Sequence, residues 1–276
     1  MRLAHLDFER PLPMNATRKM AIGTWRHAGG NPQAAMAVDA DLERLRTFLA
    51  ERAAAGDPIT YTHVFAAIAG RAMRRYPELR SVLRRGQLYP RKEVSALVQV
   101  ALGRDRLTGY VLHNIDRMSP TQIRVELDTA VAQMRSGDGG DRFATVSALL
   151  NLLPAPLVGR ALDAAGWLFY GANINPGIFG LPQDPFGTIQ VNNLGGLGMD
   201  DVRGPYVPWM RSVGVVALTR THEAPVRAAD GGVAWRTRMK VWVIVDHRLM
   251  DGFLAREIRP FVESYLENPE RLWSAP

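Results

Sequence analysis

Residues 240–252 read KVWVIVDHRLMDG, and this stretch decides the fold that the sequence predicts. Its five consecutive apolar residues, 241–245, predict a strand covered on both faces, because a strand with one face in water alternates apolar and polar residues. His247 follows this strand, and Asp251 and Gly252 form a turn before the next helical pattern. A histidine at the end of a buried strand is held rigidly, and a carboxylate four residues later can fix the turn.

Two interpretations of this histidine stay open from the residues alone. In the first, His247 is a general base that removes a proton from a substrate. In the second, it is a structural strand-end residue, and Asp251 only caps the helix that follows. The sequence contains no Gly-x-Ser-x-Gly nucleophile elbow, no phosphate-binding Gly-x-Gly-x-x-Gly and no histidine pair with metal-ligand spacing. The motifs therefore favour catalysis by a single general base, and no metal is expected.

The rest of the chain predicts one α/β domain. Apolar residues at helical spacing predict a helix that Asp39 or Asp41 caps and that Gly56 and Pro58 stop, and another helix over 61–76. Ser119 and Gln122 have the spacing of a capping box at the start of a further helix. Strands are predicted over 94–102, 107–113, 187–192, 212–221 and 236–246. The last helix is predicted over 251–266, and Pro260 should kink or restart it.

Length and composition are those of a folded globular protein. The 276 residues are 47% hydrophobic and 22% charged, which excludes disordered, collagen-like and coiled-coil classes. Cysteine is absent, so disulfides, cysteine-ligated metals and thiol nucleophiles are excluded. The first residues do not have the pattern of a signal peptide, so the expected location is the cytoplasm.

The positive charge is concentrated in one segment. The chain has a formal net charge of +7. Residues 71–92 contain eight Arg and Lys against Glu78 alone, which equals that whole excess. Two interpretations remain. The segment is a surface that binds phosphates or an acidic carrier protein, or it is an arginine-rich face in contact with solvent. Nucleic-acid binding has no motif behind it. The arginines of this segment that are candidates for phosphate binding are Arg71, Arg74, Arg75, Arg80, Arg84 and Arg85.

An apolar segment over about 143–180 stands out because Arg160 and Asp163 are its only charged residues up to Phe179. Its prolines and this charged pair interrupt every window long enough to span a membrane. Three interpretations remain: a lid or tunnel for a bulky acyl group that involves Trp167 or Phe169, an additional contact between subunits, or ordinary core.

His247, Asp251 and Gly252 match the His-x-x-x-Asp-Gly motif shared by chloramphenicol acetyltransferase and the dihydrolipoyl acyltransferases of 2-oxo acid dehydrogenase complexes. The longer Asp-His-Arg-x-x-Asp-Gly signature of the second family is complete. Further similarity lies upstream, so that the resemblance covers most of the chain and leaves 143–179 as an apparent insertion. The similar stretches are 18–21, 38–46, 62–77 and 188–195.

The resemblance implies a chloramphenicol acetyltransferase-like fold, with a mixed sheet flanked by helices and active sites between the subunits of a homotrimer. It implies acyl transfer from a thioester with His247 as general base, and a structural Asp251 that pairs with Arg18. The family's oxyanion-binding Ser or Thr aligns with Asn192, whose amide can also donate a hydrogen bond. Gly252 and Asn193 take supporting roles; the alternative for both asparagines is that they satisfy strand-end backbone groups.

The substrates implied by the resemblance come from outside the chain. No lipoyl domain precedes the catalytic core, so no covalently bound cofactor is expected. The expected donor is a coenzyme A or phosphopantetheine thioester, with an acyl carrier protein or a separate lipoyl domain as possible partner, and the arginine-rich segment would contact its phosphates. The alternatives are a thioesterase-like hydrolase, and a non-catalytic trimeric scaffold in which Asn192 marks the loss of the family's hydroxyl.

Overall fold

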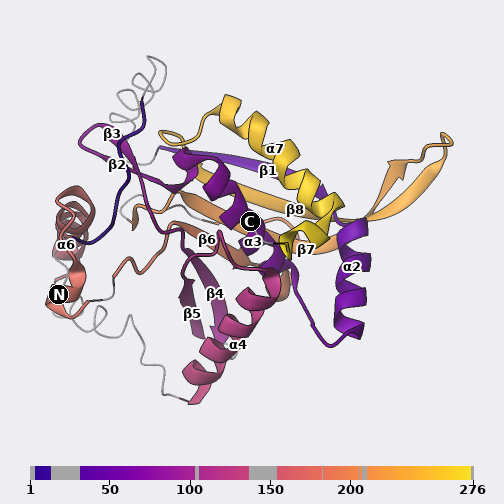
Figure 1. Cartoon of the computed structure of the whole chain (residues 1–276), viewed down its shortest axis with the longest axis horizontal. Coiled ribbons are helices and arrows are strands. Elements are labelled where there is room, and N and C mark those ends of the chain that lie inside the picture. Colours follow the sequence, from indigo (N-terminus) through magenta and orange to yellow (C-terminus); the bar gives the residue numbers. More distant parts are fainter. Residues whose placement is uncertain are drawn as a thin grey trace.

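The computed structural model describes residues 4–13, 32–102, 106–136, 154–181, 183–204, 206 and 210–274. These residues form a mixed sheet with helices packed on it, so the predicted α/β class is confirmed (Figure 1). Two expectations concern residues outside these ranges. They are the pairing of Arg18 with Asp251, and the first part of the apolar segment, 143–153.

The main sheet has six strands in the order β1-β8-β7-β6-β4-β5. Its inner pairs β4/β6 and β6/β7 are parallel, and the other pairs are antiparallel. A separate two-stranded sheet is formed by β2 and β3. The strands are β1 (Gln33–Asp41), β2 (Ser81–Arg84), β3 (Gln87–Pro90), β4 (Ala96–Leu102), β5 (Arg106–Leu112), β6 (Ile189–Asn193), β7 (Gly214–Arg227) and β8 (Val233–Asp246).

Strand β8 is paired along both edges and buried on both faces at its C-terminal half, as its apolar run predicts. Val241 and Val245 belong to the main hydrophobic core with α2, α3 and α7. Ile244 belongs to a smaller cluster with Tyr206 and Val215. Because successive side chains of a strand point to opposite faces, the helices and the Tyr206 segment cover opposite faces of the sheet.

The helices form where the sequence has apolar residues at helical spacing. Helix α3 occupies the centre of the core and is buried from His63 to Met73. Before α4, Ser119 N–H donates to Gln122 Oε1 over 2.8 Å and Gln122 N–H to Ser119 Oγ over 3.3 Å, which confirms the capping box. The helices are α2 (Glu43–Ala54), α3 (Tyr61–Arg75), α4 (Pro120–Ser136), α6 (Ala155–Gly166) and α7 (Gly252–Glu267).

Single-turn helices connect several of these elements. All but one are 3₁₀ turns, and η2 is a π-helical turn that continues α6. They are η1 (Pro77–Arg80), η2 (Trp167–Gly171), η3 (Pro176–Phe179), η4 (Gly195–Leu197) and η6 (Pro269–Leu272).

Strands β7 and β8 differ in length from their predictions, and α7 excludes one of the two outcomes expected at Pro260. Helix α7 runs through Pro260 without restarting, so only the expected restart is wrong; apolar residues on both sides of the proline, such as Ile258 and Phe261, pack on the core. Strands β7 and β8 are longer than predicted: their outer residues, 223–227 and 233–237, pair only with each other and project from the body as a hairpin (Figure 1). The sequence there is polar and contains Pro225, so its apolar pattern does not reveal the strand.

The described part of the apolar segment lies beside the sheet, outside both hydrophobic clusters (Figure 1). Trp167 is 67% exposed and Phe179 58%. Tyr170 of the same part is only 4% exposed, so its apolar side chains are divided between the surface and the interior, and the three interpretations of the segment stay predictions. Among the helices within the described ranges, none has the length and apolarity to cross a bilayer.

Candidate functional site

His247 lies in the turn that follows β8, and its neighbours hold that turn in place. The carboxylate of Asp246 is buried, and it accepts hydrogen bonds from Nε and Nη2 of Arg248 over 2.9 and 2.6 Å. Tyr206 Oη lies 3.3 Å from the same carboxylate. The backbone N–H of His247 donates to Pro32 O over 2.7 Å. The turn that carries His247 is thus held by the pair of Asp246 and Arg248, by Tyr206 and by the backbone bond to Pro32 O.

The roles of Asp246, Arg248 and Tyr206 were not predicted from the sequence. The Asp-His-Arg run carried a signal for the first two, since an aspartate and an arginine two residues apart can pair across a tight turn. Tyr206 lies about 40 positions from the motif in sequence, and only the fold brings it there. Burial raises the pKa of Tyr206, and the Asp246 carboxylate adds to that effect, so its hydroxyl stays protonated.

Asp251 caps α7. Its Oδ1 accepts the N–H of Leu254 over 3.0 Å, as the structural interpretation of this residue predicts. Gly252 is the first residue of α7. A Cβ at this position would meet no atom within 4 Å, so nothing in the described part of one chain requires a glycine there.

Asn192 and Asn193 lie at the C-terminal end of β6. Asn192 is 7% exposed, and its Oδ1 accepts no hydrogen bond within the described residues. Asn193 is exposed; its Nδ2 donates to Thr62 Oγ1 over 3.0 Å, and its Oδ1 accepts Gly196 N–H. Asn193 therefore links β6 to the first turn of α3.

A single chain does not bring His247 and Asn192 together. Asn192 pairs with Ala217, which pairs with Trp242, five residues before His247. This register separates the two by about 16 Å along the strands and about 10 Å across them. Chemistry that uses both side chains would need them from different copies of the chain.

The arginine-rich segment is not one cluster, which corrects the expectation of a joint phosphate site. Arg71 is 6% exposed, and its guanidinium donates to Asp116 O inside the protein. Arg80 pairs with Glu9, and Arg84 donates to Gly171 O. Helix periodicity and a turn send these side chains in different directions. The arginines of the set that remain exposed are Arg74, Arg75 and Arg85.

A second buried polar group joins the chain's first residues to the apolar segment. Arg91 forms an ion pair with Asp184, and both side chains are almost fully buried. Tyr170 Oη donates to Asp184 Oδ1 over 2.9 Å. The His5 ring lies 3.0 Å from both Phe169 O and the Asp184 amide nitrogen, and burial lowers the pKa of His5. Sequence reasoning missed this group, because its members are far apart in the chain.

Comparison with protein families gives one match, and it covers most of the chain. The model described as 2-oxoacid dehydrogenases acyltransferase (catalytic domain) matches residues 8–140 and 184–274. The unmatched stretch between them contains α6. The comparison with curated proteins gave no match.

Solved structures share the fold at low sequence identity. A probable dihydrolipoamide acetyltransferase from Listeria monocytogenes aligns with a TM-score of 0.62 and 19% identity, over 94% of this chain and 95% of that one. Dihydrolipoamide acetyltransferase from Azotobacter vinelandii aligns with a TM-score of 0.64 and 18% identity, over 96% and 94%. A chloramphenicol acetyltransferase aligns with a TM-score of 0.53 and 14% identity, over 94% and 100%. The fold is therefore chloramphenicol acetyltransferase-like.

Proposed function

Because the chain belongs to the family of 2-oxoacid dehydrogenase acyltransferases, in its catalytic domain, we propose that it transfers an acyl group from a thioester to a thiol, hydroxyl or amine acceptor. His247 is the general base. The observation that carries this proposal is the fixed turn at the end of β8, in which Asp246 and Arg248 hold the backbone on both sides of His247. A base must be positioned before its chemistry can matter.

In this mechanism the His247 imidazole takes the proton of the acceptor. The acceptor's sulfur, oxygen or nitrogen then attacks the thioester carbonyl and forms a tetrahedral oxyanion. The Asn192 amide donates a hydrogen bond to that oxyanion. The intermediate collapses, the carbon–sulfur bond breaks, and the leaving thiolate takes the proton back from the imidazolium.

The site forms between subunits of a homotrimer in this proposal. The support is the register of the sheet, which keeps Asn192 far from His247 in one chain. A closed cyclic trimer repeats one interface three times and can place the two side chains face to face at each. Gly252 would then lie at the same interface, where it leaves room for a neighbour.

The donor is a coenzyme A or phosphopantetheine thioester. Arg74, Arg75 and Arg85 are the exposed arginines that could contact its phosphates. An acyl carrier protein or a lipoyl domain on another chain would present the same thioester chemistry on a protein arm.

The test is donor consumption by the purified protein. The protein is mixed with acyl-CoA donors and with dithiol, alcohol or amine acceptors, and free coenzyme A and acylated product are followed by chromatography. We expect His247→Ala to abolish product formation. His222→Ala is the matched control, because His222 lies exposed in the projecting hairpin. Equal activity of His247→Ala and the parent would refute the proposal.

The same experiment distinguishes the alternatives. Free acid without acylated product, dependent on His247, would identify a thioesterase-like hydrolase. Activity that appears only after Asn192→Ser would favour a scaffold that lost its hydroxyl donor.

A further inference from the structure

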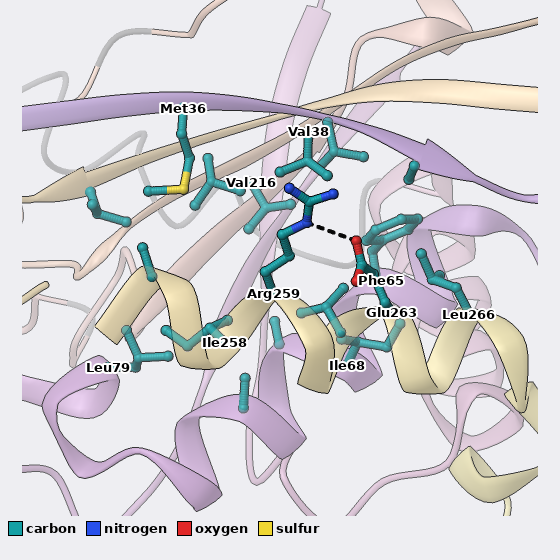
Figure 2. Close-up of a pocket in the computed structure, with 18 of the residues that line it drawn as sticks. Met36, Val38, Phe65, Ile68, Leu79, Val216, Ile258, Arg259, Glu263 and Leu266 are labelled. Carbon is teal, nitrogen blue, oxygen red and sulfur yellow. Dashed lines mark hydrogen bonds and ion pairs between the residues drawn. The ribbon is translucent and has the colours of Figure 1, made fainter. Parts of the chain in front are cut away.

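An apolar cavity of about 420 Å³ lies between the sheet and α7. Met36 and Val38 of β1 point into it from one side, and Ile258 of α7 and Phe65 and Ile68 of α3 line it from the other (Figure 2). Protein cores contain few voids larger than a water molecule, whereas small-molecule sites have volumes of roughly 300 to 1,000 Å³. The size of this cavity is that of a ligand site.

The interior of the cavity is suited to an apolar occupant. Its deep walls are valine, isoleucine, leucine, methionine, alanine and phenylalanine side chains. Charged groups lie only at the mouth, where Arg259 reaches from α7 toward Val38 and pairs with Glu263 over 2.8 Å (Figure 2). Water in such a space would find no polar partners, and an empty apolar space destabilises the fold in proportion to its volume.

One end of the cavity lies at the turn that carries His247. On β8, alternate residues Val241, Val243 and Val245 line the cavity, and Val245 is two residues before His247. Met250, three residues after His247, lines it as well. The stretch from Val241 to Val245 is about 13 Å long, so the cavity is elongated along the strand.

The far end of the cavity is acidic. Near the C-terminal half of α7 and the last residues of β1, four carboxylates and two guanidinium groups surround the opening. They are Asp39, Asp41, Glu263, Glu267, Arg238 and Arg259. This excess of negative charge disfavours the carboxylate of a free fatty acid at that end. At the His247 end, Val245 and Met250 line the cavity, and none of the lining residues there is charged.

We propose that this cavity holds the aliphatic chain of the acyl donor, with the thioester at His247 and the chain extending under α7 toward the acidic opening. The inference rests on the proposed function and specifies its substrate class: thioesters of medium-length aliphatic acids. It places the acyl chain in the core of one subunit, away from the apolar segment with Trp167.

The test measures binding and stability separately from turnover. In the His247→Ala background, calorimetry compares dodecanoyl-CoA with acetyl-CoA. We expect dodecanoyl-CoA to bind about tenfold tighter or more, because additional methylenes leave water. Ala69→Leu and Ala255→Leu fill the cavity from α3 and α7. Each should remove this preference without lowering the unfolding temperature.

Ala67→Leu is the matched control. Ala67 lies on the same helix as Ala69, is fully buried and does not line the cavity, so its enlargement should lower the unfolding temperature. Equal binding of the two thioesters, or a preference that survives both filling variants, would overturn the inference. The inference would also be overturned if both filling variants lowered the unfolding temperature as much as Ala67→Leu does. A preference in binding without turnover by the parent would instead refute only the proposed function.

Discussion

Asn192 of β6 is level with Trp242 of β8 across the intervening strand β7, whereas His247 lies five residues beyond Trp242, in the turn that follows β8. The two residues that the family resemblance assigns to one active site are therefore separated in a single chain. The proposed mechanism therefore requires an oligomer, and this requirement can be tested directly.

Mixed oligomers of two inactive variants should recover activity. His247→Ala and Asn192→Ala are co-expressed with different affinity tags, and double-tagged assemblies are purified. If each site takes His247 from one subunit and Asn192 from the next, about one third of the sites in a double-tagged cyclic trimer keep both side chains. Acyl transfer well above either variant alone is expected. Activity no higher than in the separate variants would show that the two residues do not act in one shared site.

Replacing Asn192 should separate activity from stability. Asn192→Ala removes the proposed oxyanion donor and should lower kcat by about 100-fold or more. The same change should leave the unfolding midpoint in urea unchanged or raised, because Oδ1 is buried without a described hydrogen-bond partner and such a group costs about 1 to 3 kcal/mol. Asn192→Ser keeps a donor and should retain more activity than Asn192→Ala. A destabilised but fully active Asn192→Ala would assign the residue to structure alone.

The buried ion pair of Arg91 and Asp184 should matter more than an exposed one. Asp184→Ala leaves the guanidinium buried without its carboxylate and should lower the free energy of unfolding by about 3 to 5 kcal/mol. Asp200→Ala is the control, since its pair with Arg220 is exposed and should contribute about 1 kcal/mol or less. Urea unfolding at one fixed protein concentration measures both. Similar losses in the two variants would contradict the role assigned to burial.

His63 should make the protein sensitive to acid. Burial lowers the pKa of His63 from 6.5 to about 4, so the folded state keeps this ring neutral where the unfolded chain binds a proton. Stability is therefore lost as pH falls from about 6.5 toward 4, by about 3 kcal/mol from this residue.

His63→Gln tests this dependence. Thr60 N–H donates to His63 Nδ1 over 3.2 Å at the start of α3, and a glutamine can accept the same bond in a capping box. The variant should match the parent near pH 8 and be more stable near pH 4.5. Some acid sensitivity should remain in the variant, because burial lowers the pKa of His5 as well. Parallel stability curves across this range would show that His63 does not cause the effect.

Local patterns were sufficient for many of the elements. The apolar run before His247, the spacing along α3 and the Ser119–Gln122 capping box each act over a few residues, so the sequence alone predicts their structure. The long hairpin of β7 and β8 was underestimated because its outer half is stabilised by strand pairing, without an apolar pattern.

The sequence by itself determined the fold class, the family and the histidine that follows β8, because the patterns that reveal them lie in contiguous residues. The tertiary structure alone decided which groups meet. It buried Arg71 and dispersed the arginines, joined Arg91 to Asp184, set Asn192 apart from His247 and opened the cavity under α7. These relationships depend on strand order and helix placement, which bring together residues that are distant in the chain and carry no local signal of their meeting.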